Sequence, residues 1–474
     1  MVYHFTPLPQ WSLADAAAVM GADAEPGWAE RRFGAVSMDS RTIAPGQFFL
    51  ALRGEKLDGH RFAAQAVGRG ASGLIVDRQF EPGDWDLDGV PVIVVDDTTR
   101  ALGDLAAEVR RRWAGPLLAI SGSAGKTTTR RLVATALSRH MKTLEPIKNY
   151  NNLIGMPLTL LELADHRAAV MELGMNQPGE LRRLSEIAHP SAAVLTNIGT
   201  AHIGMFGSQA ALSAAKLDLF RGCAPGTPLA VNRTCPNTNG GIGEFIGRHP
   251  VIGFSCDDAG LADAVIRIEN GELAEDGGTR FDLVLPAQTL RGLELRLFGA
   301  YLIENVAAAA ALLHAGGFDP AWVADILPEF KSEPLRGQIE HVGGMTLILD
   351  CYNASPAGMV GALGTLIEMP VRGRRVLVLA DMLELGERSA EFHKALMALI
   401  AQMPGAVLFG LGPRMSALAE ELKGLGRPAR GFDDRDEMAE ALAAELRPGD
   451  AVLFKGAHAF GLERAAEKIL GTCS

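Results

Sequence analysis

The residues with the clearest chemical potential lie in one glycine-containing stretch, Ser121-Gly122-Ser123-Ala124-Gly125-Lys126-Thr127-Thr128-Thr129. An apolar run at 116–120 precedes this stretch, and a helical pattern at 130–137 follows it. Glycines let several backbone N–H groups turn toward one anion, and a helix N-terminus adds partial positive charge. The lysine of such a loop reaches the outer phosphates of a nucleotide, and the threonine after it offers a hydroxyl to Mg²⁺. The stretch therefore predicts a phosphate site formed by Gly122, Ser123, Ala124, Gly125, Lys126, Thr127 and Thr128.

The same stretch has a simpler interpretation. The usual phosphate loop carries a further glycine upstream, whereas position 120 is Ile, so the match is to the shorter Gly-x-x-Gly-Lys-Thr form. A glycine-rich turn with an exposed lysine would have this composition too. The strand before the loop and the helix after it favour nucleotide binding.

Three further residues are candidates for metal or phosphate contacts. Glu172 ends a predicted strand at 168–172, and a carboxylate at a strand end beside a phosphate loop commonly holds Mg²⁺. His202 follows another predicted strand at 191–199 and is either a ligand or a solvated loop histidine. Lys216 falls within a helical pattern, where the spacing alone favours a solvated lysine.

Two polar segments are candidates for substrate binding. Asn151 and Asn152 stand in an unusual polar cluster, which suits a polar ligand or a turn. Ser40 stands beside glycine turns, where it can hold a phosphate-bearing ligand or belong to a surface loop.

Composition limits the class of protein. The chain has 474 residues, enough for about three domains. Its net charge of −11 argues against a nucleic-acid-binding surface. Five scattered cysteines fit free thiols in a reducing compartment. No apolar run approaches the roughly 18 to 20 residues that span a bilayer. We expect a cytoplasmic protein that acts without a membrane.

Strand and helix patterns alternate through the last third of the chain. Apolar strands are predicted at 345–350, 375–381, 406–410 and 451–456, with helical segments between them. This alternation predicts a mostly parallel sheet whose carboxyl edge carries polar strand ends. We predict an α/β protein with three domains: a small N-terminal α/β domain at 1–105, a central P-loop ATPase-type parallel sheet at 106–330 and a C-terminal Rossmann-like domain at 331–474.

An ordered set of motifs along nearly the whole chain resembles the Mur ligases, the ATP-dependent amide-forming enzymes of peptidoglycan synthesis. The motifs are Asp39-Ser40-Arg41, Pro45-Gly46, Asp58-Gly59-His60, Gly122 to Thr128, Asn151-Asn152, Glu172-Leu173-Gly174-Met175-Asn176, Asn197-Ile198-Gly199, Ala201-His202, Lys216, Asp350, Tyr352-Asn353-Ala354, Asp381-Met382-Leu383-Glu384-Leu385-Gly386, His393 and Lys455-Gly456. The Tyr-Asn-Ala and Asp-Met-x-Glu-Leu-Gly motifs point to the member that adds a dipeptide. One departure is Tyr301-Leu302, where the family commonly has a His-Asn pair.

The resemblance implies a reaction. ATP converts a carboxylate of a UDP-linked tripeptide into an acyl phosphate, and the amine of D-alanyl-D-alanine then displaces phosphate. Lys126, His202 and Lys216 are the implied catalytic residues, and Lys216 is expected to be carbamylated. The implied Mg²⁺ ligands are Thr127 and Glu172 for one ion, and His202 and Lys216 for a second ion. The implied substrate and nucleotide contacts are Ser40 for the UDP group, Asn151 and Asn152 for substrate, and Asn305, Arg336, Asp350 and Asn353 for ATP.

Two other functions share parts of this pattern. A related ligase, such as one that builds folate polyglutamates, would share the central motifs but not those of the outer domains. A regulator that binds nucleotide without acyl transfer would not need Glu172, His202 and Lys216 together with the loop. The expected partners are therefore small molecules, with no nucleic acid, and the expected state is a monomer.

Overall fold

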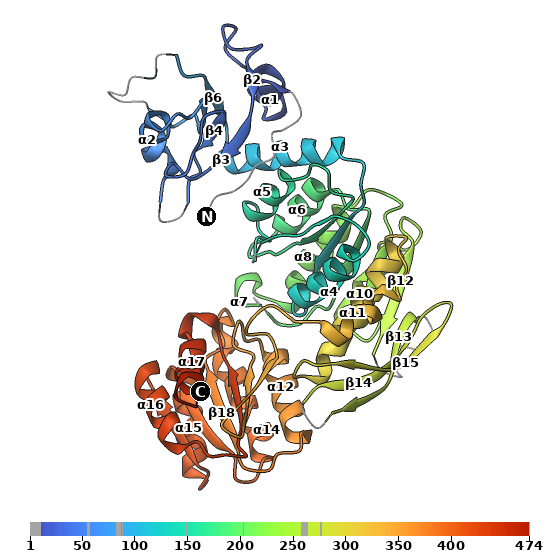
Figure 1. Cartoon of the computed structure of the whole chain (residues 1–474), viewed down its shortest axis with the longest axis vertical. Helices are drawn as coiled ribbons and strands as arrows, with labels where there is room; N and C mark the ends of the chain where they lie inside the picture. Colours follow the sequence, from blue (N-terminus) through green and yellow to red (C-terminus); the bar gives the residue numbers. More distant parts are fainter. Residues whose placement is uncertain are drawn as a thin grey trace.

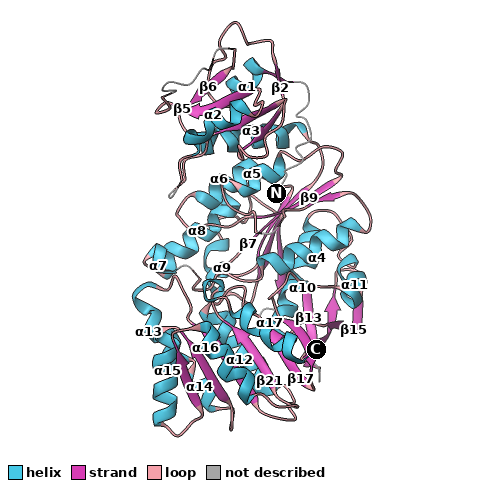
Figure 2. Cartoon of the chain, turned by 60° about the vertical axis from the view of Figure 1, so that its left-hand side comes forward, coloured by secondary structure: helices cyan, strands magenta, loops and turns pink. Residues whose placement is uncertain are grey.

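The computed structural model describes residues 11–54, 57–81, 87, 89–147, 149–201, 203–256, 264–274 and 277–473. Three α/β units follow one another along the long axis of the molecule (Figure 1). Each unit is a sheet flanked by helices, as the view coloured by secondary structure shows (Figure 2). The predicted three-domain α/β class is confirmed.

The N-terminal unit is built on a four-stranded parallel sheet of order β3-β4-β5-β6. Its strands are β3 (Ala35–Ser37), β4 (Gln47–Leu50), β5 (Gly73–Asp77) and β6 (Val92–Val95). Its other elements are β1 (Trp11–Ser12), β2 (Arg32–Phe33), α1 (Leu13–Val19), η1 (Gly59–Phe62) and α2 (Ala63–Gly68). The Ser12 hydroxyl accepts a bond from the backbone N–H of Asp15 at 3.1 Å, and the Asp15 carboxylate accepts one from the backbone N–H of Ser12. This capping box starts α1.

A long helix, α3 (Thr98–Arg112), joins this unit to the next. Asp97 caps its start by accepting bonds from two backbone N–H groups. Its apolar face, which includes Leu102, Leu105 and Val109, packs against α1 on one side and against α5 and α6 on the other. The predicted division between residues 105 and 106 lies inside this helix.

The central unit holds a nine-stranded sheet of order β15-β14-β13-β12-β11-β10-β7-β9-β8. Its strands are β7 (Leu117–Ser121), β8 (Thr143–Leu144), β9 (Ala168–Glu172), β10 (Ala192–Leu195), β11 (Leu229–Asn232), β12 (Val251–Ser255), β13 (Ala264–Leu273), β14 (Thr279–Val284) and β15 (Thr289–Leu295). Strands β7 to β13 run parallel to one another, whereas β14 is antiparallel to β13 and β15 is antiparallel to β14. The parallel core is buried on both faces, which explains its continuous apolar runs.

Helices cover both faces of the central sheet. They are α4 (Lys126–Ser138), α5 (Gly155–Leu160), α6 (Glu180–Ala188), α7 (Ile203–Phe206), α8 (Gln209–Arg221), α9 (Pro236–Ile242), η3 (Ala300–Leu302), α10 (Ile303–Ala315), α11 (Trp322–Ile326) and η4 (Leu327–Glu329). Helices α4 and α10 pack against each other on one face, and α6 and α8 do so on the other. Side chains alternate between two cores along β7, with Leu117 and Ala119 in one and Leu118 and Ile120 in the other.

The C-terminal unit holds a six-stranded sheet of order β16-β17-β21-β18-β19-β20. Its strands are β16 (Gln338–Val342), β17 (Met345–Leu349), β18 (Arg375–Ala380), β19 (Val407–Leu411), β20 (Ala429–Phe432) and β21 (Ala451–Lys455). Only β16 is antiparallel to its neighbour. The helices are α12 (Pro356–Glu368), η5 (Gly386–Arg388), α13 (Ser389–Ala395), α14 (Met397–Ala401), α15 (Pro413–Gly424), α16 (Arg435–Glu445), η6 (His458–Phe460) and α17 (Leu462–Cys473).

Two further observations bear on the predicted class. Within the described part of the chain, every helix is too short or too polar to cross a bilayer. The four cysteines with described side chains, Cys223, Cys235, Cys256 and Cys351, are free thiols, as the scattered spacing predicted.

The capping box of α1 gives a test of this fold. Replacing Ser12 by Ala removes the acceptor of the Asp15 N–H bond, so we expect the N-terminal unit to lose about 1 kcal/mol of unfolding free energy. Urea unfolding followed by circular dichroism measures the change. Ser12→Thr keeps an acceptor and is the matched control. Equal stability of Ser12→Ala and the wild type would contradict the assignment.

Candidate functional site

The glycine stretch forms a loop between the end of β7 and the start of α4. Gly122 and Gly125 adopt φ of 148° and 81°, a region that other residues rarely occupy. A Cβ at Gly122 would overlap the Thr196 hydroxyl, and one at Gly125 would overlap the Asn305 side-chain oxygen. Both positions therefore need glycine, because of conformation and because of space.

Two lysines converge on this loop. Lys126 Nζ donates to the carbonyl oxygens of Gly122 at 2.9 Å and Ser123 at 3.4 Å. Lys216, buried in α8, donates its Nζ to the same Gly122 oxygen at 3.2 Å. Burial lowers the pKa of Lys126. Burial, and then the charge of Lys126, lowers the pKa of Lys216 well below its ordinary range. The arrangement favours a neutral amine on Lys216.

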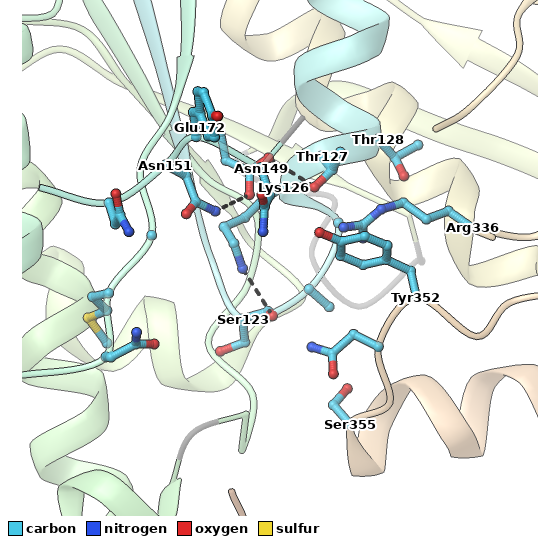
Figure 3. Close-up of a pocket in the computed structure, with 18 of the residues that line it drawn as sticks. Ser123, Lys126, Thr127, Thr128, Asn149, Asn151, Glu172, Arg336, Tyr352 and Ser355 are labelled. Atoms are coloured by element: carbon cyan, nitrogen blue, oxygen red, sulfur yellow. Dashed lines mark hydrogen bonds between the residues drawn. The ribbon is translucent and has the colours of Figure 1, made fainter. Parts of the chain in front are cut away.

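The carboxylate of Glu172 faces the start of α4 from the end of β9, which pairs with β7. Its two oxygens accept bonds from the Thr127 hydroxyl and the Asn151 side-chain amide, each at 2.9 Å (Figure 3). A hydroxyl and a carboxylate at this spacing supply the hard oxygen ligands that Mg²⁺ prefers. Within the described residues, no group of three or more His, Cys, Asp or Glu side chains gathers to hold a metal. Thr127 and Glu172 thus fit Mg²⁺ as part of a set that also needs oxygens from a bound ligand.

These residues form the floor of a cavity of about 590 Å³. Its lining comes from the glycine loop, from the segment around Asn151, and from the C-terminal unit across the gap (Figure 3). Met38 brings the N-terminal unit to the same cavity. The lining residues are Met38, Ser123, Ala124, Gly125, Lys126, Thr127, Thr128, Asn149, Tyr150, Asn151, Asn152, Ile154, Gly155, Leu158, Glu172, Gly174, Met175, Asn176, Glu180, Lys216, Tyr301, Leu302, Arg336, Asp350, Tyr352, Asn353, Ser355, Gly358 and Lys455.

The wall opposite the loop carries both signs of charge. The Arg336 guanidinium lies over the Tyr352 ring, 4.0 Å from its centroid. Its buried Nε has no hydrogen-bond partner in the described residues. Asp350 pairs with Lys455 and accepts a bond from the Tyr301 hydroxyl at 3.0 Å. A cation that stacks on an aromatic ring and still has a free donor can hold a nucleotide.

The predicted site residues fall into three groups. The structure brings together on the cavity all the predicted loop residues except Gly122, together with Glu172, Lys216, Asn151, Asn152, Arg336, Asp350 and Asn353. Gly122 does not line the cavity, but its backbone carbonyl accepts the hydrogen bonds of Lys126 and Lys216. Asn152 has a local structural role too, because its Oδ1 accepts bonds from the N–H groups of Ile154 and Gly155 at the start of α5.

Of the remaining three, Asn305 and Ser40 lie elsewhere. Asn305 is buried in α10 beneath Gly125 and does not line the cavity, so its proposed nucleotide contact stays a prediction. Ser40 is buried in the N-terminal unit, where its hydroxyl donates to Gln65 at 2.7 Å. His202 lies outside the described residues.

Several lining residues were not predicted as site residues. Lys455 ends β21 beside Asp350, so the rule that polar strand ends meet at one sheet edge could have found it. Tyr352 follows Asp350 by two residues and belongs to the same strand end. Tyr301 had no such signal, because its place beside Asp350 results from the docking of two units.

Comparisons with known proteins match most of the chain. Three family models match consecutive parts of the chain: "Mur ligase family, catalytic domain" at 32–110, "Mur ligase middle domain" at 120–313 and "Mur ligase, glutamate ligase domain" at 336–458. A UDP-N-acetylmuramoyl-tripeptide–D-alanyl-D-alanine ligase from Synechocystis sp. is 31% identical over 93% of this chain and 92% of its own length.

Solved structures give the same result. A crystal structure of MurF from Acinetobacter baumannii is 30% identical in sequence and has a TM-score of 0.88. The match covers 98% of this chain and 100% of the MurF chain. MurF from Thermotoga maritima in complex with ADP has the same fold, with a TM-score of 0.80 and 24% identity. That match covers 93% of this chain and 98% of the MurF chain.

A glycine substitution tests the geometry of the loop. Gly125→Ala places a Cβ against Asn305 at a positive φ, so the loop must shift and we expect affinity for ADP to fall at least about tenfold. Calorimetric titration with ADP measures the affinity. Gly364→Ala, in open space on α12, is the matched control and should bind as the wild type does. Unchanged affinity of Gly125→Ala would contradict the described loop.

Proposed function

Since the chain belongs to the Mur ligase family, we propose that it joins D-alanyl-D-alanine to a UDP-N-acetylmuramoyl-tripeptide at the expense of ATP. The observation that supports this most directly is the convergence of Lys126, Thr127 and Glu172 at the glycine loop. A ligase named for this reaction matches the chain over nearly its whole length. The nucleotide-gated regulator is disfavoured, because it has no use for a metal carboxylate and a second buried lysine beside the phosphates.

The chemistry has to overcome repulsion between two anions. The carboxylate of the tripeptide must touch the γ-phosphate of ATP, and both groups are negative. Lys126 and the loop N–H groups supply positive potential where charge develops. Thr127 and Glu172 would hold Mg²⁺, which when bound neutralises phosphate charge. Because Thr127 and Glu172 are buried, their electrostatic interactions are stronger than they would be in solvent.

The proposed reaction has two steps. A carboxylate oxygen attacks the γ-phosphorus, the bond to the β-phosphate oxygen breaks, and ADP leaves an acyl phosphate behind. The free amine of D-alanyl-D-alanine then attacks the acyl carbon, loses a proton, and displaces inorganic phosphate as the amide forms. Closure of the C-terminal unit over the loop would protect the acyl phosphate from water.

Lys216 is proposed to act as a carbamate. Its neutral amine would attack CO₂ and lose a proton, which turns a buried cation into an extended carboxylate. The shared Gly122 acceptor and the nearby charge of Lys126 both favour the neutral amine that this step needs. A carboxylate at this position would add an oxygen ligand for Mg²⁺, with His202 as a further proposed ligand.

The C-terminal wall is proposed to hold the nucleotide. Arg336, Asp350 and Asn353 lie across the cavity from the glycine loop, so ATP bound at Lys126 extends toward them. Ser40 is proposed to bind the UDP group, and Asn151 and Asn152 the peptide part of the substrate. The chain is proposed to act as a monomer. Its proposed use of ATP and a UDP-linked precursor supports a cytoplasmic reaction.

A substrate-omission experiment tests the function. We expect the purified chain to release phosphate from Mg-ATP only when a UDP-N-acetylmuramoyl-tripeptide and D-alanyl-D-alanine are both present. A panel of tripeptides that differ in the third residue identifies the preferred substrate. Lys126→Ala should lower the rate at least about a hundredfold without unfolding the protein. The proposal would be wrong if phosphate were released at the same rate with and without D-alanyl-D-alanine, or if Lys126→Ala kept full turnover.

A rescue experiment tests the carbamate. Lys216→Ala removes the amine and should lower turnover at least about tenfold. Short carboxylic acids such as acetate or propionate fit the space left by the side chain, and we expect them to restore part of the activity. Lys126→Ala is the control, since a carboxylate cannot replace a cation there. Full activity of Lys216→Ala without any added acid would show that no carbamate is needed.

A further inference from the structure

One short segment contacts both sides of the cavity. Tyr301, in η3, donates its hydroxyl to Asp350 Oδ2 of the C-terminal unit at 3.0 Å. Asn305, four residues later in α10, packs its side chain against Gly125 of the glycine loop. Its Oδ1 also accepts a bond from the Thr129 hydroxyl at 3.5 Å. The segment 301–305 therefore spans from the phosphate loop to the opposite wall.

The other partner of Asp350 cannot make this link. Lys455 also bonds to Asp350 Oδ2, but the two residues stand at the ends of the neighbouring strands β21 and β17. Their ion pair is internal to the C-terminal sheet. This ion pair fixes the Asp350 carboxylate within the C-terminal unit. It does not fix the distance between that carboxylate and the glycine loop. Tyr301 is the donor that reaches Asp350 from the central unit.

The Tyr301 ring is held on both sides. It packs closely on Gly361 of α12, where an added Cβ would lie 2.7 Å from the ring. The next residue back, Ala300, donates its N–H to the Thr365 hydroxyl of the same helix at 3.2 Å. The ring also contacts the apolar cores of both the central and the C-terminal units. It is thus fixed at the joint, and its hydroxyl has little freedom to move away from Asp350.

The hydroxyl keeps its proton in this position. Burial, the negative charge of Asp350 and the hydrogen bond to it raise the pKa of Tyr301 well above its usual value. The phenol therefore remains a donor at neutral pH. Asp350 lines the cavity, and its second oxygen, Oδ1, makes no hydrogen bond to any residue within the described ranges.

We propose that Tyr301 is a positioning residue for nucleotide binding: it holds Asp350 at a fixed distance from the glycine loop, so that Oδ1 meets a nucleotide whose phosphates lie at Lys126. The inference deepens the proposed function, because it rests on nucleotide binding in this cavity. In this role Tyr301 does not contact the reacting atoms. Its effect should appear in nucleotide affinity and leave the chemical step unchanged.

The test is a comparison of ADP affinity by calorimetry. Tyr301→Phe keeps the ring and its packing and removes only the hydroxyl. We expect ADP to bind about tenfold more weakly, the change that follows loss of one hydrogen bond to a charged group. In turnover assays the KM for ATP should rise by a similar factor, while kcat and the KM for D-alanyl-D-alanine stay unchanged.

Two controls separate positioning from general loosening of the joint. Thr365→Val removes the bond from Ala300 and the bond that Thr365 donates to the Gly361 carbonyl, both at the same interface and neither to Asp350, and it should bind ADP as the wild type does. In an Asp350→Ala background, Tyr301→Phe should have no further effect, because the two residues act as one unit.

Three results would overturn the proposal: wild-type affinity in Tyr301→Phe, an equal loss in Thr365→Val, or a loss of the same size in the Asp350→Ala background. A wild-type chain that binds ADP but forms no amide would remove the ligase function and still leave the affinity comparison decisive. The two failures are therefore distinguishable.

Discussion

Two lysine side chains share one acceptor, the carbonyl oxygen of Gly122, and the site depends on this interaction. Two ammonium groups on one oxygen repel each other, and the buried one, Lys216, also lacks water. The cost falls if Lys216 is neutral, and Lys126 then supplies the cation beside the phosphates. A protein with a net charge of −11 thus still presents a local cation at its glycine loop.

The glycine loop follows a strand that is paired on both edges and buried on both faces. Strand β7 lies between β9 and β10, and the cores on both faces contain its side chains. The same pairing places Glu172 beside Thr127, since β9 ends level with β7. Parallel strands bring their carboxyl ends to one edge, so the loop, the carboxylate and the amide of Asn151 meet without any long-range adjustment.

The cavity has two walls that belong to different folding units. The central unit supplies the groups for phosphate, and the C-terminal unit supplies Arg336, Asp350 and Tyr352. Ligands that bridge two units bind well only if the distance between the walls is fixed, because ordering that distance on binding would weaken affinity. Residues 301–305 provide a direct link, with Asn305 on the loop and Tyr301 on Asp350.

The sequence by itself determined the local parts of this protein. Apolar runs located β7, β9, β18 and β21, and glycine spacing located the loop, because these features depend on neighbouring residues only. The motif order identified the family. Tertiary structure decided the rest: that Lys216 is buried on Gly122 and not solvated, that Asn305 supports the loop from below, and that Tyr301 reaches Asp350. Those contacts join residues that are 49 to 180 positions apart in the chain. No local sequence pattern encodes the packing of one unit on another.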